Sequence, residues 1–395
     1  MSFNDKLNQR LQTLQQQQLY RTRRLIESAQ DTVLMSHGKS LINFCSNDYL
    51  GLANHPDMKQ AFKNAVDQYG VGSGASQLIS GHQTPHHQLE EELADFLDCE
   101  KVLLFSTGYM ANLGVVSALT ERRDEVFEDK LNHASLIDAA LLSRAELSRY
   151  THCDDESLST QLTRSTAKNK FIVSDGVFSM DGDKANVTEL SSLAKQHDAV
   201  LMIDDAHGIG VLGQTGKGII EELNLSIGDD LPIFVGTFGK AFGSFGAFVA
   251  GSNALIENLI NFSRSYIYTT AIPAAVAEAT RTSLKLIRQG NKKRQRLQQN
   301  IKQFRQGCVE RGLPLSAEPG YGQYSAIQPL IIGEAEQAVS LSNALKEAGF
   351  LISAIRPPTV PQNTSRLRIT FSANHTDEQI EQLLDALSQH YVSSH

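Results

Sequence analysis

The chain has 395 residues, of which 41% are hydrophobic and 20% are charged, and its net charge at pH 7 is −8. A chain of this size and ordinary composition is expected to fold as a globular protein of more than one domain. The negative charge argues against a general nucleic-acid-binding protein, and no apolar run is long enough to predict a membrane span.

Residues 1–40 are interpreted as an N-terminal helical segment, polar and glutamine-rich, with helix up to about residue 30. Arg21 lies in a basic cluster with Arg23 and Arg24. A solvated charge run is the simpler interpretation, although guanidinium groups would also suit an acyl carboxylate. No secretory signal is expected at the start. Four widely separated cysteines are interpreted as free thiols of a cytoplasmic enzyme: Cys45, Cys99, Cys153 and Cys308.

Residues 41–285 alternate apolar strand patterns with amphipathic helical patterns, such as the one over residues 87–97. Alternation of this kind predicts a large α/β domain with a parallel or mostly parallel sheet and helices on both faces. The clearest strand candidates are residues 102–105, 171–173, 199–203, 233–236 and 247–250. A further strand is expected to end near Phe127.

Residues 286–395 have a different texture and predict a small C-terminal α+β domain. A long helical pattern precedes two strand candidates and a further helical pattern. The last helix begins at Thr376, where threonine followed three residues later by Gln379 is typical of a capping box.

Two polar motifs follow neighbouring apolar strands in the large domain. Asp204 ends the strand over residues 199–203, and Lys240 follows the strand over residues 233–236. A helix N-cap is the simpler interpretation of the aspartate, and a surface position that of the lysine. An acid and a lysine at adjacent strand ends are also the minimum set for pyridoxal phosphate, since lysine forms the Schiff base and a carboxylate keeps the pyridine nitrogen protonated.

Other residues near these motifs are candidates for holding such a cofactor. Gly108 and Tyr109 begin a predicted helix, whose backbone N–H groups make an anion site. Thr237 lies three residues before Lys240 and could donate its hydroxyl to a phosphate. His207 could bind the ring's phenolate oxygen and His133 could stack on the ring, although both could equally be structural histidines.

Two competing interpretations are set aside. The glycine-rich stretch over residues 70–81 follows no strand and lacks the spacing of a dinucleotide-binding loop, so a loop lining a substrate pocket fits better. Asp204, Asp205 and His207 could be imagined as metal ligands, but no further cluster supports them, and no metal is expected.

The chain resembles the α-oxoamine synthases, which are pyridoxal-phosphate enzymes of the aspartate-aminotransferase fold type. The resemblance implies fold type I: a large domain with a mostly parallel seven-stranded sheet, and a small C-terminal domain. Within this family, the chain is most similar to the members that make 8-amino-7-oxononanoate in the synthesis of biotin. The matching stretches are residues 41–52, 175–183, 204–208, 325–329, 354–361 and 366–368.

This resemblance implies a role for each matching residue. Lys240 would bind the cofactor and shuttle the α-proton, and Asp204 would pair with the ring nitrogen. His207 and Ser179 would lie near the ring oxygen, and His133 would stack on the ring; with Lys240 and Asp204, the two histidines form the expected catalytic set. The phosphate would be held by Gly108, Tyr109 and Thr237, and by Thr269 or Thr270 of a neighbouring subunit, which implies a homodimer. Substrate groups would contact Arg21, Asn47, His133, Thr359 and Arg368, with Arg368 binding the amino-acid carboxylate.

The implied reaction is an acyl transfer: L-alanine condenses with a pimeloyl thioester, carried by CoA or by acyl carrier protein, and loses CO₂. Asp175 stands where many of these members have glutamate, and Ala75 where glycine is usual. A glycine C-acetyltransferase, or a synthase with another acyl donor, is therefore the alternative. A non-catalytic partner subunit is a second alternative, which the joint presence of Lys240, Asp204 and His207 disfavours.

Overall fold

Seven strands form the central sheet of a computed structural model that describes residues 1–17, 19–315 and 325–392. The strand order is β3-β9-β8-β7-β6-β4-β5. β9 pairs antiparallel with both neighbours and the other pairs are parallel, as expected for a mostly parallel sheet. The strands are β3 (Lys101–Phe105), β4 (Glu125–Asp129), β5 (Glu146–Tyr150), β6 (Lys170–Asp175), β7 (Ala199–Asp204), β8 (Ile233–Thr237) and β9 (Ala247–Gly251).

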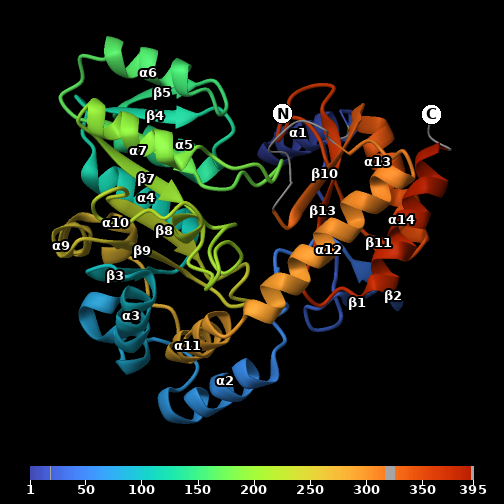
Figure 1. Cartoon of the computed structure of the whole chain (residues 1–395), viewed down its shortest axis with the longest axis horizontal. Coiled ribbons are helices and arrows are strands. Elements are labelled where there is room, and N and C mark those ends of the chain that lie inside the picture. The colour runs from blue at the N-terminus through green and yellow to red at the C-terminus, as the bar shows by residue number, and fades with distance from the viewer. Residues whose placement is uncertain (18, 316–324, 393–395) are drawn as a thin grey trace.

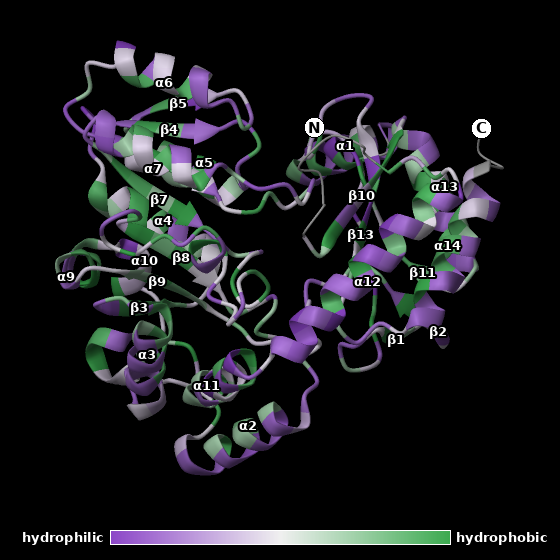
Figure 2. Cartoon of the chain, viewed as in Figure 1, coloured by the Kyte–Doolittle hydropathy of each residue, from purple (hydrophilic) through white to green (hydrophobic). Residues whose placement is uncertain are grey.

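Helices cover both faces of this sheet because its strands are apolar on both sides (Figure 2). Ile172 of β6 packs into one core cluster, whereas Phe171 and Val173 pack into the cluster on the other face. The first cluster includes residues of α3 (Thr84–Leu97), α6 (Asp155–Arg164), α7 (Val187–Gln196) and α11 (Ala274–Arg288). The second includes residues of α4 (Gly108–Leu119), α5 (Ala134–Ser143), α9 (Asn253–Phe262) and α10 (Arg264–Ile267).

Three further elements of this lobe connect the layers. α2 (Pro56–Tyr69) packs on α11, and the short helix α8 (Ile219–Glu222) follows the long turn after β7. A π-helical segment, η1 (Gln77–Gly81), occupies the glycine-rich stretch that the sequence assigns to a loop. Within the described residues, no helix combines the length and the apolar character that a membrane crossing requires.

The second lobe is joined to the first by the long helix α12 (Asn291–Glu310), which runs from α11 toward the C-terminal elements (Figure 1). Its strands form two three-stranded sheets, β10-β13-β12 and β1-β2-β11. α13 (Ala335–Glu347) and α14 (Asp377–Val392) belong to this lobe. The strands are β1 (Val33–Ser36), β2 (Lys39–Asn43), β10 (Ile327–Gly333), β11 (Phe350–Leu351), β12 (Ser353–Ile355) and β13 (Ser365–Thr370).

The capping box expected at the last helix is present. Thr376 Oγ1 accepts from the backbone N–H of Gln379 at 3.2 Å, and Gln379 Oε1 accepts from the backbone N–H of Thr376 at 3.1 Å. Domain boundaries at residues 40/41 and 285/286 remain predictions: β2 and α11 each run across one of them, and β2 pairs in parallel with β11.

The N-terminal helix is shorter than the sequence analysis expects. α1 (Phe3–Gln16) ends well before residue 30 and buries none of its residues. A polar helix without a buried face gains little from packing, so nothing favours its extension.

Candidate active site

The candidate site lies where three adjacent strands end. β6, β7 and β8 are neighbours in the sheet, and Asp175 of β6 is in register with Asp204 of β7. Thr237 ends β8, and Lys240 follows it in a turn. Because parallel strands present their carboxyl ends at one edge, residues far apart in the sequence meet here. The strand-end motifs are therefore brought together as expected.

Asp204 is buried and held by two hydrogen bonds. Its Oδ2 accepts from Asn112 Nδ2 at 2.7 Å, and its Oδ1 accepts from the backbone N–H of Ala206 at 3.0 Å. Turns, not a helix, follow Asp204, so the N-cap interpretation is wrong. Donors on both oxygens hold the carboxyl group in one orientation, as a partner for a ring nitrogen would need to be held.

Lys240 is half-buried, and burial lowers the pKa of its ammonium group to about 8 against the opposing attraction of Asp204 and Asp175. The turn that carries it closes with a bond from the Gly243 N–H to the Lys240 carbonyl at 2.8 Å. Gly243 has φ +58°, and a Cβ there would lie 2.3 Å from the backbone nitrogen of Ala53. Only glycine fits this turn, which presents a lysine able to exchange its proton near neutral pH.

His207 is buried beside the lysine. Its Nδ1 lies 2.7 Å from the Tyr49 hydroxyl, which also donates to Asn47 Oδ1 at 3.1 Å. Burial lowers its pKa well below the usual range, and the positive charges of Lys240 and Arg368 add to the shift. His207 is therefore a neutral imidazole that can donate or accept one hydrogen bond toward a ligand.

His133 caps the N-terminus of α5 at the mouth of the site. Its backbone N–H donates to Asp175 Oδ2 at 2.6 Å, and its Nδ1 lies 2.8 Å from Ser135 Oγ. Ser135 Oγ in turn accepts from Asn112 at 2.8 Å. This network holds His133 in a fixed position relative to the carboxylate of Asp204. A cofactor ring lying between the two side chains would need both of them held in place.

The N-terminus of α4 forms an anion cradle next to β8. Thr107 caps this helix by accepting from the Met110 N–H at 3.1 Å, and Gly108 is the first helical residue. A Cβ on Gly108 would lie 3.9 Å from Thr237 Oγ1, so the helix start and this hydroxyl are neighbours. Backbone N–H groups, the helix dipole and a hydroxyl together suit a phosphate. Tyr109 follows Gly108, and its hydroxyl donates to Asp138.

The second lobe contributes Arg368 of β13, whose side chain is buried. Its two terminal nitrogens each lie 3.3 Å from Asn47 Oδ1, and its Nε donates to the Ser179 carbonyl oxygen at 2.6 Å. Three segments distant in the sequence thus converge on one guanidinium. The convergence brings together Asn47 and Arg368, both expected to bind substrate, and Ser179, expected near the ring oxygen.

Arg21 and Thr359 lie together but in a different place. Both line a groove of about 560 Å³ beside α1, with Leu14, Tyr20 and Pro357 among its other walls. Apolar walls with two arginines, Arg21 and Arg356, suit a chain that ends in an acid group.

Thr269 and Thr270 are not joined to the Lys240 cluster by any of the hydrogen bonds in the described residues. Thr270 is exposed, and its backbone pairs with Ser76 in an isolated antiparallel bridge. An exposed position is the one that a contact with a neighbouring subunit would require.

The sequence analysis gave no role to two residues that the structure places in the site, Asn112 and Tyr49. Asn112 lies one helical turn after Gly108, on the same face of the predicted helix. A polar residue at that position of an anion-binding helix was the signal that could have indicated its role. Tyr49 lies within the stretch that carries the resemblance, and only the tertiary contact with His207 reveals its role.

Comparison with known proteins places the chain in a family. The model of the aminotransferase class I and II family matches residues 39–387. The chain belongs to this family. The 8-amino-7-oxononanoate synthase of Methylococcus capsulatus is 56% identical over 369 residues, which cover 93% of this chain and 94% of that protein.

Solved structures of related enzymes share the fold. A serine palmitoyltransferase variant from S. paucimobilis, solved with a bound PLP–myriocin aldimine, has a TM-score of 0.92 and 31% identity, covering 99% of this chain and 98% of the other. An 8-amino-7-oxononanoate synthase from Francisella tularensis has a TM-score of 0.77 and 35% identity, covering 89% and 98%. The fold type expected from the resemblance is confirmed.

Proposed function

We propose that this chain is an 8-amino-7-oxononanoate synthase that condenses L-alanine with a pimeloyl thioester, on CoA or on acyl carrier protein, and releases CO₂ and the free thiol. The relatives that are 51–56% identical over nearly the whole chain carry that name. The observation that carries the proposal is the meeting of Lys240, Asp204 and the buried guanidinium of Arg368 at one sheet edge.

The residues present fit pyridoxal phosphate. The α4 cradle and Thr237 offer donors for its phosphate, Asp204 a hydrogen-bonded carboxyl partner for its ring nitrogen, and Lys240 the amine that anchors it. When bound, this cofactor supplies the electron sink that makes an amino-acid α-proton removable. His133 would pack against the ring, and neutral His207 and Ser179 would hold its oxygen substituent.

The chain's own groups then handle substrate and protons. Arg368 binds the alanine carboxylate through its guanidinium, oriented by Asn47 and the Ser179 carbonyl. Lys240 removes the α-proton and later returns one to the same carbon after CO₂ has left, a role suited to its pKa of about 8. The groove with Arg21 and Thr359 receives the pimeloyl chain, with Arg21 facing its free carboxylate.

We further propose a cytoplasmic homodimer in which Thr269 or Thr270 completes the phosphate site of the partner subunit. Large apolar side chains exposed on the site-bearing lobe favour such an interface. Those more than half exposed include Leu141, Leu142, Phe262 and Tyr268. The four cysteines are unpaired, as is usual in a reducing compartment.

Product analysis tests the proposed reaction. Purified enzyme is incubated with L-alanine and either pimeloyl-CoA or pimeloyl-acyl carrier protein, and thiol release and product mass are measured. The matched control supplies glycine and acetyl-CoA, the substrates of the alternative enzyme. Thiol release with the control pair and none with either pimeloyl donor would contradict the proposal.

A further inference from the structure

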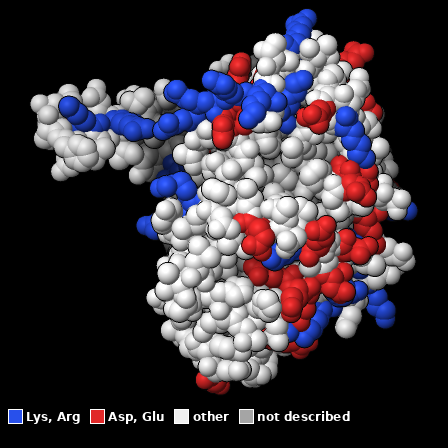
Figure 3. Space-filling model, turned by 90° about the vertical axis from the view of Figure 1, so that its left-hand side faces the viewer, with Lys and Arg blue, Asp and Glu red and all other residues white. Residues whose placement is uncertain are grey.

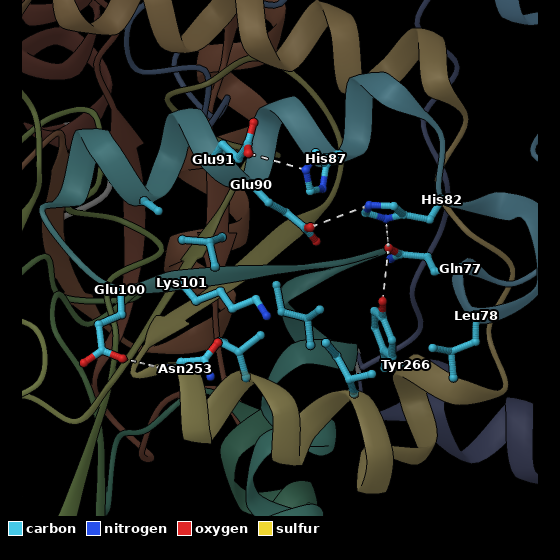
Figure 4. A pocket seen from close by; sticks show the side chains of 15 residues that line it. Gln77, Leu78, His82, His87, Glu90, Glu91, Glu100, Lys101, Asn253 and Tyr266 are labelled. Atoms are coloured by element: carbon cyan, nitrogen blue, oxygen red, sulfur yellow. Dashed lines mark hydrogen bonds and ion pairs between the residues drawn. The ribbon is translucent and has the colours of Figure 1, made fainter.

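A second cluster of chemically capable side chains lies outside the candidate active site, at the edge of the sheet. It occupies the wall of a pocket of about 770 Å³ between η1, α3, α9 and α10, next to the edge strand β3. Figure 4 shows His82, His87 and Glu90 turned toward one another on this wall. One ligand atom from each of the three lies within 4.8 Å of the others. None of them takes part in the proposed reaction.

The three ligand atoms lie within 4.8 Å of one another, a little wider than the separation of atoms bound to one metal ion. His82 Nε2 lies 4.0 Å from Glu90 Oε2, too far for a hydrogen bond. Two nitrogens and an oxygen bound to one ion at about 2.0–2.2 Å lie roughly 3–4 Å apart. Small side-chain rotations would therefore bring the three atoms onto one cation.

Both histidines are oriented by outer partners, as metal-bound histidines are. His82 Nδ1 lies 3.2 Å from Gln77 Oε1, which also accepts from the Tyr266 hydroxyl at 3.4 Å, and this leaves Nε2 facing Glu90. His87 Nε2 lies 3.4 Å from Glu91 Oε1. Gln77 is itself anchored, because its Nε2 donates to the Leu104 carbonyl at 3.1 Å.

The electrostatic surroundings favour a cation. Figure 3 looks at the side of the molecule on which α3 lies, where acidic side chains gather. Such a surface raises the local concentration of cations. α3 and the turn after it contribute Glu91, Asp98 and Glu100, whereas Glu92 and Asp95 are paired with Arg281 and Arg288.

The other cluster with metal-ligand chemistry lacks this open geometry. In that cluster, of Asp129, His152 and Cys153, both ring nitrogens of the histidine are already hydrogen-bonded: Nδ1 to Asp129 Oδ1 at 2.8 Å and Nε2 to Asp183 Oδ2 at 2.7 Å. That histidine is satisfied as a bridge between two carboxylates and has no nitrogen left for an ion.

We propose that His82, His87 and Glu90 form a site for a divalent transition-metal cation, with Zn²⁺ as the best match. Two imidazoles and one carboxylate are a ligand set that zinc accepts, with water in the fourth position. The ion would tie the η1 segment to α3. The backbone of Ser76, just before η1, pairs with Thr270, so the brace would also support the segment proposed to contact the partner subunit.

Zinc titration of the untagged, chelator-treated holoenzyme tests this site by calorimetry. We expect one Zn²⁺ per chain and a higher Tm with zinc. His82→Gln and His87→Gln are each expected to weaken binding by at least about 10-fold, and Gln77→Leu, which removes only an outer partner, by roughly 10- to 100-fold. His37→Gln changes an exposed histidine of the β1–β2 turn and is the matched control, expected to bind as the wild type does.

Zinc bound equally by the wild type and by the His82→Gln/His87→Gln double variant would overturn the proposal. Binding lost on Cys153→Ser, with His82→Gln unaffected, would assign the ion to the other cluster and overturn it as well. Neither outcome bears on the proposed synthase reaction, which is measured separately by thiol release.

Discussion

The side-chain amide of Asn112, on the first turns of α4, donates a 2.7 Å hydrogen bond to Oδ2 of Asp204, at the end of β7. The helix whose N-terminus is proposed to bind the phosphate therefore also holds the carboxylate proposed to face the ring nitrogen. The two ends of the proposed cofactor site are set by one rigid element, so their separation is fixed before any ligand binds.

Asn112→Ala is expected to weaken the site through Asp204. A hydrogen bond to a charged group contributes about 1.5–3 kcal/mol, so kcat/KM should fall roughly 10- to 100-fold and cofactor should dissociate more readily. Ser117→Ala is the control, since its hydroxyl bonds only within α4, to the Leu113 carbonyl. Steady-state kinetics and cofactor retention on dialysis measure both. Unchanged kinetics in Asn112→Ala would mean that Asp204 needs no such support.

The rate at which the enzyme takes up cofactor should depend on pH through the titration of the Lys240 amine. Burial lowers the pKa of this amine to about 8, and only the neutral amine is nucleophilic. The uptake rate of cofactor-free enzyme should therefore rise with pH through a midpoint near 8 and level off about one unit above it. Stopped-flow absorbance measures it. Asp204→Asn removes an attraction that stabilises the ammonium form and should move the midpoint to lower pH. A midpoint near 10 in the wild type would contradict the burial argument.

Arg368→Lys is expected to raise the KM for L-alanine about tenfold or more, because lysine cannot reproduce the planar fork that binds a carboxylate. The KM for the pimeloyl thioester should change much less, since its groove is lined by Arg21 and Thr359. Arg21→Lys is the reciprocal variant. Equal effects of Arg368→Lys on both KM values would show that the arginine supports the fold and does not discriminate between substrates.

Mixing two damaged subunits tests the proposed dimer. Lys240→Ala should abolish activity, and if Thr270 serves the partner's phosphate, Thr270→Ala should weaken cofactor binding. A heterodimer of the two variants keeps one site with both residues intact, so mixing after gentle dissociation should restore part of the activity. Equal mixtures that give no more than the average of the two variants would place Thr270 outside the partner's site.

His152 should stabilise the fold most at low pH. Although burial opposes it, hydrogen bonds to Asp129 and Asp183 raise the pKa of His152 to about 12. A histidine with a raised pKa contributes its full share to the free energy of unfolding below its ordinary pKa of about 6.5. This share declines as the pH rises toward 12. Urea unfolding of His152→Gln should show a loss of about 3 kcal/mol at pH 6 and a smaller loss at pH 9. His37→Gln should stay within about 0.5 kcal/mol of the wild type, and a His152→Gln loss that grew with pH would refute the assignment.

Apolar runs in the sequence predict most strands of the large-domain sheet and the residues at which they end. Runs such as Ala199–Asp204 are apolar on both faces, which marks a buried parallel strand, and the polar residue that ends each run must emerge at the same sheet edge. The strand pattern alone therefore groups Asp204, Thr237 and Lys240. The strand Glu146–Tyr150 was not predicted, because it lies at the edge of the sheet and is half-exposed. It therefore lacks the run of apolar residues that marks a buried strand.

The contacts that distant residues make with the strand-end groups follow from the packing of the folded chain and not from any local pattern. Asn112 on Asp204, Tyr49 on His207 and Asn47 on Arg368 join segments whose separation in the sequence carries no information about contact. The approach of His82 to Glu90 depends likewise on the π-helical turn of η1, which no periodicity predicted. A local hydrophobic pattern in the sequence indicates which face of one helix or strand is buried. The partners of a polar side chain depend instead on how the helices and strands pack together, and this packing is a property of the whole chain.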